Sequence, residues 1–274
     1  MLIDTHCHLD APEFDADRES VIADAQAAGV KAIVLPAIAP SNFDTVRRLA
    51  WRMPGGVYAL GIHPLFVQTA ADDALECLRS ALERQRDDPR LVAVGEIGLD
   101  RFVREISEGE AWERQWRFFH RQLELAAEFG LPVVLHVRRS VDLVLKGLRQ
   151  VGEVSGIAHA FNGSRQQADQ LIERGVALGI GGAMTYPRAL QIRRLAAEIP
   201  LQHLVLETDS PDIPPAWLHA PDRRNTPAQV AGVACALAEL RQISVVEVVH
   251  ATAASACGHL PGLAAAIGAG QDAR

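Results

Sequence analysis

Cysteine is scarce in this sequence, and the few cysteines are widely spaced. Four occur among 274 residues, and no pair has the close Cys-x-x-Cys spacing of a zinc ribbon or a disulfide-stabilised small domain. We therefore expect reduced thiols. The four cysteines are Cys7, Cys77, Cys235 and Cys257.

Long apolar runs and excess positive charge are also missing. No run reaches the roughly 18 apolar residues that span a bilayer, and the start of the chain lacks the cationic residues of a signal peptide. We therefore expect a cytoplasmic protein without membrane contact, and a monomer is compatible with this composition. The 34 acidic and 27 basic residues give a formal charge of −7. This balance disfavours a broad basic surface for polyanions, but permits a phosphate substrate held through metal ions.

Hydrophobic residues are plentiful, and their spacing repeats along the chain. They make up 49% of the sequence, enough for a large core, which excludes a disordered or fibrous chain. Short runs rich in Val, Ile and Leu alternate with stretches of helical periodicity, a pattern typical of parallel βα units. The predicted strands are Leu2–His6, Lys31–Pro36, Val57–Ile62, Leu91–Glu96, Pro132–Val137, Gly156–His159, Val176–Ile180 and His203–Glu207.

Eight strands with helical segments between them predict an α/β fold, a single-domain (β/α)8 TIM barrel. We expect residues 1–262 to form the barrel and residues 263–274 to form a flexible C-terminal tail. An open doubly wound sheet would usually show a glycine-rich phosphate turn after an early strand, and the glycines at 179–182 come too late in the chain for that. The predicted helices are Glu19–Ala28, Phe43–Met53, Asp73–Arg86, Glu110–Phe129, Val141–Val151, Arg165–Arg174, Arg188–Ile199 and Pro227–Leu240.

Polar side chains gather where the predicted strands end. The carboxyl ends of all strands in a parallel barrel open onto one face, so these side chains converge at one mouth. His6 and His8 alternate with Cys7 and therefore point to the same side. Imidazoles and carboxylates in such a cluster suit zinc, manganese or iron. The strand-end candidates are His6, His8, His63, Glu96, His136, His159 and Asp209.

Five motifs at these positions carry a family resemblance. The chain closely resembles the TatD family of metal-dependent deoxyribonucleases in the amidohydrolase superfamily. The motifs at the fourth and eighth strands are long enough to be specific, whereas His-x-His is shared across the superfamily. The motifs are Ile3–His8, Gly61–Pro64, Val94–Asp100, Leu135–His136 and Leu206–Pro211.

The resemblance implies two divalent metal ions per chain, of which magnesium, manganese and zinc are candidates. It implies that Glu96 bridges the ions and takes part in catalysis. We expect Asp209 to accept the proton of the attacking water, because a carboxylate can exchange a proton over a short fixed distance. The resemblance further implies that Asp4 and Asp100 orient ligands, as carboxylates around metal sites commonly do. The implied ligand sets are His6, His8 and Asp209 for one ion, and His136 and His159 for the other.

The implied activity is phosphodiester hydrolysis in DNA by a water molecule that two metal ions activate. The shortage of positive charge favours a small footprint, so we expect 3′-to-5′ exonuclease action on single-stranded ends. Arginines that follow the strands could contact phosphate. The candidate substrate contacts are His63, Arg138, Arg139, Arg165, Arg223 and Arg224.

Two other functions use the same residues. The metals could serve a hydrolase of a small ester, lactone, amide or phosphoester, because a fold and its ligands do not fix a substrate. The barrel could also have kept its metals as a non-catalytic interaction protein. The intact set of six ligand positions argues against a non-catalytic interaction protein. The long strand-four and strand-eight motifs favour DNA over a small-molecule substrate.

Overall fold

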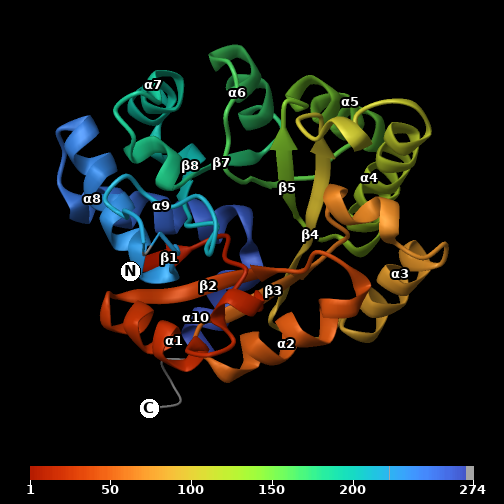
Figure 1. Ribbon diagram of the computed structural model, residues 1–274, viewed down its shortest axis with the longest axis horizontal. Coiled ribbons are helices and arrows are strands. Elements are labelled where there is room, and N and C mark those ends of the chain that lie inside the picture. The colour runs from red at the N-terminus through yellow and green to blue at the C-terminus, as the bar shows by residue number, and fades with distance from the viewer. Residues whose placement is uncertain (222, 270–274) are drawn as a thin grey trace.

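Eight parallel strands form one sheet in chain order in the computed structural model, which describes residues 1–221 and 223–269. The strands curve around a common centre and the helices surround them (Figure 1). This arrangement confirms the predicted (β/α)8 barrel. The strands are β1 (Leu2–Asp4), β2 (Val30–Pro36), β3 (Gly56–Leu60), β4 (Leu91–Asp100), β5 (Val133–Arg138), β6 (Gly156–Ala158), β7 (Val176–Ile180) and β8 (Leu204–Leu206).

The barrel closes between the segments that follow β1 and β8. The N–H of Thr5 donates to the carbonyl of Leu206, at 3.0 Å, and the N–H of Asp209 donates to the carbonyl of His6, at 2.8 Å. A parallel bridge also joins Cys7 to Ser210. The seam of the barrel is therefore built from the two segments that carry the His-x-His and Thr-Asp-Ser motifs.

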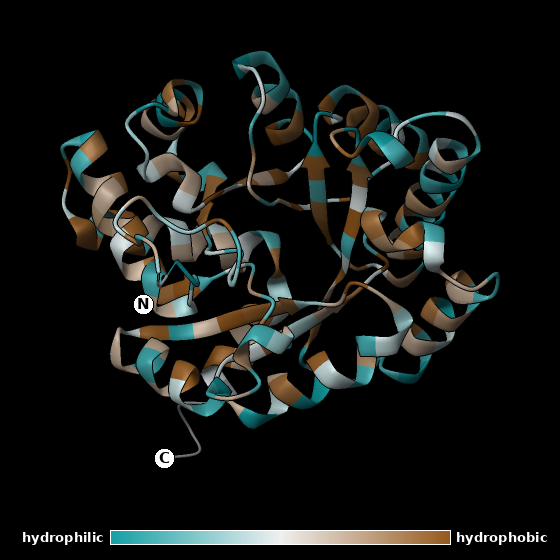
Figure 2. Ribbon diagram, viewed as in Figure 1, coloured by the Kyte–Doolittle hydropathy of each residue, from teal (hydrophilic) through white to brown (hydrophobic). Residues whose placement is uncertain are grey.

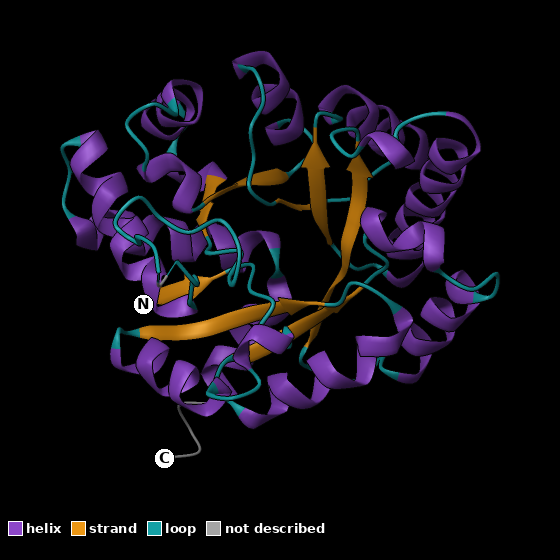
Figure 3. Cartoon of the chain, in the orientation of Figure 1, coloured by secondary structure: helices purple, strands orange, loops and turns teal. Residues whose placement is uncertain are grey.

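The helices form an outer ring around the strands (Figure 3). Hydrophobic residues concentrate on the strands, and hydrophilic residues are frequent on the surrounding helices (Figure 2). Among residues 1–221 and 223–269, no helix is long and apolar enough to cross a membrane. The helices are α1 (Arg18–Ala27), α2 (Phe43–Arg52), α3 (Ala74–Arg84), α4 (Gly109–Phe129), α5 (Val141–Val151), α6 (Arg165–Ile172), α7 (Leu190–Glu198), α8 (Val230–Arg241), α9 (Val245–His259) and α10 (Pro261–Ala269).

Local sequence explains where several helices begin and end. Ser164 caps α6 by accepting from the N–H of Gln167, whose side chain accepts from the N–H of Ser164 in return. Such a capping box satisfies two N–H groups that a helix start leaves without partners. At the end of α4, Gly130 adopts the left-handed conformation with φ of 64°. Glycine does so without the steric cost that a Cβ adds.

The prediction of a flexible tail over residues 263–274 is wrong for residues 263–269. These belong to α10, whose Leu263 is fully buried and whose Ile267 is 7% exposed. Both pack with interior strand residues such as Val34, Val57 and Val92 in one apolar cluster. Burying these apolar side chains stabilises α10, although its sequence carries few local helix signals. Residues 270–274 lie outside the described residues.

Candidate metal centre

Glu96 lies at the centre of the polar cluster in the barrel mouth. The register of β4 against β5 shifts between Val94 and Ile97, and such an irregularity redirects the side chain that it carries. Gly61 makes room for this segment, because a Cβ at Gly61 would lie 2.6 Å from the carbonyl carbon of Gly95. The Glu96 side chain is 2% exposed, so the charge of its carboxylate needs partners within the protein.

Two imidazoles face the Oε2 oxygen of Glu96, and the carboxylate of Asp209 lies beside them. The Nε2 atoms of His6 and His8 lie 3.2 Å and 3.3 Å from it and 3.2 Å from each other. The Oδ1 oxygen of Asp209 lies 3.5 Å and 3.6 Å from the same two nitrogens. The donor atoms of His6, His8 and Asp209 thus converge on one point where a cation could bind.

Three more imidazoles face the Oε1 oxygen of the same carboxylate. The Nε2 of His159 lies 2.8 Å from it, the Nδ1 of His136 lies 3.0 Å from it, and the Nε2 of His63 lies 3.3 Å from it. The nitrogens of His63 and His136 are only 3.1 Å apart. His63 therefore lies among the candidate ligands, whereas the sequence predicts a substrate contact at this position.

The charges in this cluster depend on one another. Burial opposes ionisation of Glu96, but the surrounding imidazoles, His63 and His159 foremost, hold its pKa well below its usual range. Burial also disfavours cations on the histidines, yet Glu96 outweighs it and raises the pKa of His8 to about 9 and that of His159 to about 10. Burial and the neighbouring His159 lower the pKa of His6 well below its usual range. The cluster therefore needs positive charge next to Glu96.

Divalent cations fit this need better than protons do. A neutral imidazole has one N–H, so five imidazoles cannot all satisfy their nitrogens by donating to one carboxylate. Among the described residues, the buried Nδ1 atoms of His6 and His159 have no hydrogen-bond partner. Nitrogen and carboxylate donors are the set that zinc, manganese and iron accept. The donor set thus suits bound metal, with Glu96 between the two groups of ligands.

Asp100 contacts the ring nitrogen of His136 that points away from Glu96. It is the last residue of β4, which extends four residues beyond the predicted end at Glu96. Its Oδ2 oxygen lies 3.1 Å from the Nε2 of His136, and its Oδ1 oxygen accepts from the N–H groups of Phe102 and Val103. Such a partner fixes which ring nitrogen of His136 carries the proton.

Asp4 acts on backbone groups in the structure. Its Oδ1 oxygen accepts from the N–H groups of His6 and Thr208, at 3.2 Å and 2.9 Å. Its Oδ2 oxygen accepts from the Thr208 hydroxyl at 2.6 Å. Asp4 therefore ties together the segments that follow β1 and β8, through their backbone and the Thr208 hydroxyl rather than through an imidazole.

Glu207 is a polar residue of the site that sequence reasoning did not single out. Burial raises its pKa to about 8, its Oε1 oxygen lies 4.0 Å from the Nδ1 of His159, and its Oε2 oxygen has no partner among the described residues. A Cβ at Gly179 would collide with this carboxylate, so a glycine there makes the space. Glu207 precedes Asp209 by two residues after β8, and that spacing was the signal that could have identified it.

The candidate substrate arginines divide into two groups. Arg138 and Arg139, at the end of β5, lie over the exposed ring of Phe102, with guanidinium carbons 3.8 Å and 4.7 Å from the ring centre. The others contact side chains away from the cluster. Arg165 pairs with Asp169 and Glu198, Arg223 donates to the Tyr186 hydroxyl, and Arg224 pairs with Asp17.

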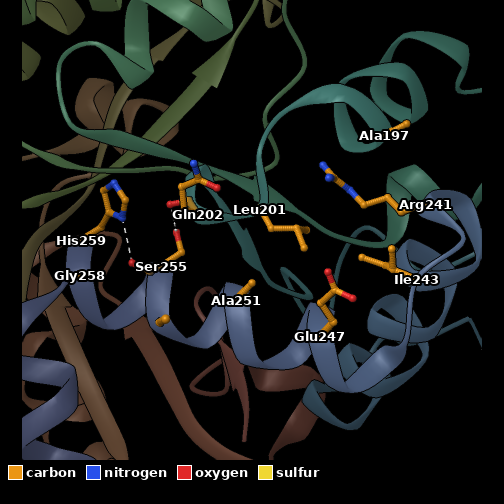
Figure 4. A pocket seen from close by; sticks show the side chains of 11 residues that line it. Ala197, Leu201, Gln202, Arg241, Ile243, Glu247, Ala251, Ser255, Gly258 and His259 are labelled. Carbon is orange, nitrogen blue, oxygen red and sulfur yellow. Dashed lines mark hydrogen bonds between the residues drawn. The ribbon is translucent and has the colours of Figure 1, made fainter.

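A separate cleft of about 670 Å³ lies away from this cluster. It is bounded by Leu201, by the end of α8 at Arg241 and by α9, on the side where β8 begins (Figure 4). Within it, the Ser255 hydroxyl donates to the carbonyl of Gln202, and the Nδ1 of His259 contacts the carbonyl of Ser255. The cleft holds none of the strand-end residues.

Comparisons with known proteins agree on one family. A family model described as "TatD related DNase" matches residues 3–260. The chain is 41% identical over 250 residues to "Uncharacterized metal-dependent hydrolase YjjV" of Escherichia coli K12, covering 91% of this chain and 93% of that protein. It is 33% identical over 269 residues to human "Deoxyribonuclease TATDN3", covering 96% and 95%.

Solved structures support the same grouping. The crystal structure of YjjV, described as a TatD homolog from Escherichia coli, has a TM-score of 0.86 and 39% identity, covering 95% of this chain and 98% of that chain. A TatD family hydrolase from Entamoeba histolytica has a TM-score of 0.83 at 20% identity, covering 94% and 97%. The second similarity shows a shared fold.

Proposed function

Because this chain belongs to the TatD family of metal-dependent hydrolases, we propose that it is a deoxyribonuclease that removes nucleotides from single-stranded 3′ ends. One observation carries the proposal. Five imidazoles and the carboxylate of Asp209 surround the buried carboxylate of Glu96 in the barrel mouth. The name of the human relative supports DNA as the substrate class.

The ligands fall into two sets that share Glu96. His6, His8 and Asp209 would hold one divalent ion on the Oε2 side of Glu96. His136 and His159 would hold a second on the Oε1 side, where His63 lies beside them, 3.3 Å from the same oxygen. When bound, such ions polarise a phosphoryl oxygen and lower the pKa of water so that it attacks near neutral pH.

In this proposal, Asp209 accepts the proton of the attacking water. Its side chain is 14% exposed, whereas that of Glu96 is 2% exposed and faces imidazoles on both oxygens. Asp209 therefore reaches the open side of the cluster. The residue has φ of 55°, a left-handed conformation that is uncommon for a residue with a side chain and is found at functional sites.

The test is release of mononucleotides from 3′-end-labelled single-stranded DNA. Protein stripped of metal and reloaded with magnesium, manganese or zinc is compared with Asp209→Asn, loaded in the same way. Asp212→Asn is the matched control, because it removes the same charge from an exposed position in the same loop. We expect metal-dependent release by the parent protein and by the control, and a loss of about a hundredfold or more in Asp209→Asn.

Two outcomes would contradict parts of this proposal. Near-normal turnover by Asp209→Asn with metal still bound would remove Asp209 as proton acceptor. No release with any ion, with metal bound, would move the function to hydrolysis of a small ester, lactone, amide or phosphoester. Turnover of a chromogenic ester would then identify that class, and absence of any turnover would favour a non-catalytic interaction protein.

A further inference from the structure

The ring of Phe102 is exposed beside the candidate metal centre. Phe102 follows the end of β4 by two residues and is 48% exposed. β4 and β5 run side by side and end at the same face (Figure 1). Two cations from the end of β5 lie over this ring, Arg138 at 3.8 Å and Arg139 at 4.7 Å from its centre.

Hydrogen bonds fix this cluster to the ligand side chains. The N–H of Phe102 donates to Asp100, at 2.7 Å, and the same carboxylate lies 3.1 Å from the ligand candidate His136. The N–H of Arg101 donates to the carbonyl of Arg138, at 2.9 Å, which joins the two loops. The ring therefore has a set position relative to the metal ligands, as binding sites on rigid elements do.

The guanidinium of Arg139 is presented without an acidic partner. Within residues 1–221 and 223–269, no carboxylate forms an ion pair with it, whereas Arg165 pairs with Asp169. Arg139 also has φ of 56°, which costs free energy and is usually retained where a side chain must point in one direction. Its N–H donors are thus available to a phosphate group.

From these contacts we propose that Phe102, Arg138 and Arg139 bind the unpaired nucleotide next to the cleaved phosphodiester. The part of the ring that the guanidinium groups leave exposed stacks on the base. The guanidinium of Arg139 contacts phosphate, together with that of Arg138, which also lies 3.8 Å from Asp100. Stacking on an aromatic ring beside cations is the usual way to hold single-stranded nucleic acid. A base inside a duplex is stacked on both faces, so this cluster favours unpaired nucleotides over paired ones. The inference rests on the proposed function.

The experiment measures stacking and binding without cleavage. A nuclease-resistant phosphorothioate oligonucleotide of about 12 nucleotides carries 2-aminopurine at one of its 3′-terminal positions. The fluorescence of 2-aminopurine falls when it stacks, and anisotropy reports binding to the metal-loaded protein. The variants are Phe102→Leu, Phe102→Tyr and Arg139→Gln. Trp51→Leu is the matched control, since Trp51 is 49% exposed under Arg90 at the far end of α2.

We expect quenching at one position by the parent protein. Phe102→Leu should abolish that quenching and weaken binding about tenfold, while Phe102→Tyr should restore both. Arg139→Gln should keep the quenching and reduce the slope of log affinity against log salt by about one. Trp51→Leu should behave as the parent does. Asp100 accepts a hydrogen bond from the backbone N–H of residue 102, which leucine keeps. We therefore expect Phe102→Leu to have the same unfolding midpoint as the parent protein.

Two results would overturn the inference in distinguishable ways. Parent-like binding and quenching by Phe102→Leu would show that the ring takes no base, while the nuclease function would stand. Absence of single-stranded DNA binding by the parent protein would overturn the proposed function together with this inference.

Discussion

Replacing Asp100 by asparagine should weaken metal binding through the tautomer of His136. The Oδ1 oxygen of Asp100 accepts from two backbone N–H groups, and its Oδ2 oxygen lies 3.1 Å from the Nε2 of His136. An asparagine oxygen can keep the backbone bonds, but its amide N–H₂ group then faces Nε2. Two donors cannot bond to each other, so the proton of His136 moves to Nδ1. Nδ1 lies 3.0 Å from the Oε1 oxygen of Glu96, and once protonated it has no lone pair with which to bind metal.

The size of the effect on metal affinity follows from comparable sites. Removing the carboxylate behind a ligand histidine typically lowers metal affinity about 10- to 100-fold. That range corresponds to about 1.4 to 2.7 kcal/mol. The remaining donors in the second set still contact Glu96, so we expect weakened rather than abolished binding.

The same change should lower the stability of the metal-free protein. Burial alone would raise the pKa of Asp100, but hydrogen bonds from His136 and from the backbone lower it from 3.8 to about 2. A shift of this size contributes about 2 kcal/mol of folding free energy. Because the folded pKa is the lower one, this stabilisation is present above about pH 4 and is lost as pH falls through about 2.

Two assays and one control separate the effects. Chelator competition gives the metal affinity, and urea unfolding in excess chelator gives stability between about pH 2 and 7. Asp88→Asn is the control, because Asp88 precedes β4 and accepts from Arg47, Trp51, Tyr58 and the N–H of Arg90. It should destabilise the protein without changing metal affinity. Unchanged metal affinity in Asp100→Asn would refute the tautomer argument.

Three further predictions concern the candidate metal centre and helix α10. Glu96→Gln removes the charge that both ligand sets face, so elemental analysis should find fewer than one ion per chain instead of about two; two ions retained would contradict the bridging role. Protons compete with metal at His8, whose pKa is raised to about 9, so chelator competition should show affinity rising from about pH 6 to 9; a flat profile would contradict this. Leu263→Ala should cost about 2–5 kcal/mol in urea unfolding; a cost below about 1 kcal/mol would mean that α10 packs loosely.

The gathering of polar residues at the strand ends could be predicted from two regularities of the fold. Side chains alternate along a strand, so His136 lies on the same side as the interior residue Val134, and His159 on the same side as Ile157. The barrel then brings the ends of all strands to one face. Neither inference needs contacts between distant residues, which is why the sequence was sufficient.

Other features depended on contacts that a sequence does not display. The guanidinium of Arg224 pairs with Asp17, 207 residues earlier, and no local pattern marks that pair. His63 lies among the candidate ligands because the segment after β3 approaches β4 closely at Gly61. Helices α9 and α10 lack a distinct apolar face, because small and apolar residues occur around their whole circumference. An amphipathic pattern therefore does not predict them.

The position of the candidate ligands links metal binding to barrel closure. His6 and His8 follow β1, and Asp209 follows β8, so the first set of donors spans the seam. Backbone hydrogen bonds from the N–H groups of Thr5 and Asp209 hold that seam together with the bonds that Asp4 accepts from Thr208. A cation held by donors on both sides would resist separation of the two ends of the sheet, because binding to the folded state alone stabilises it. The same segments therefore close the barrel and carry the candidate ligands.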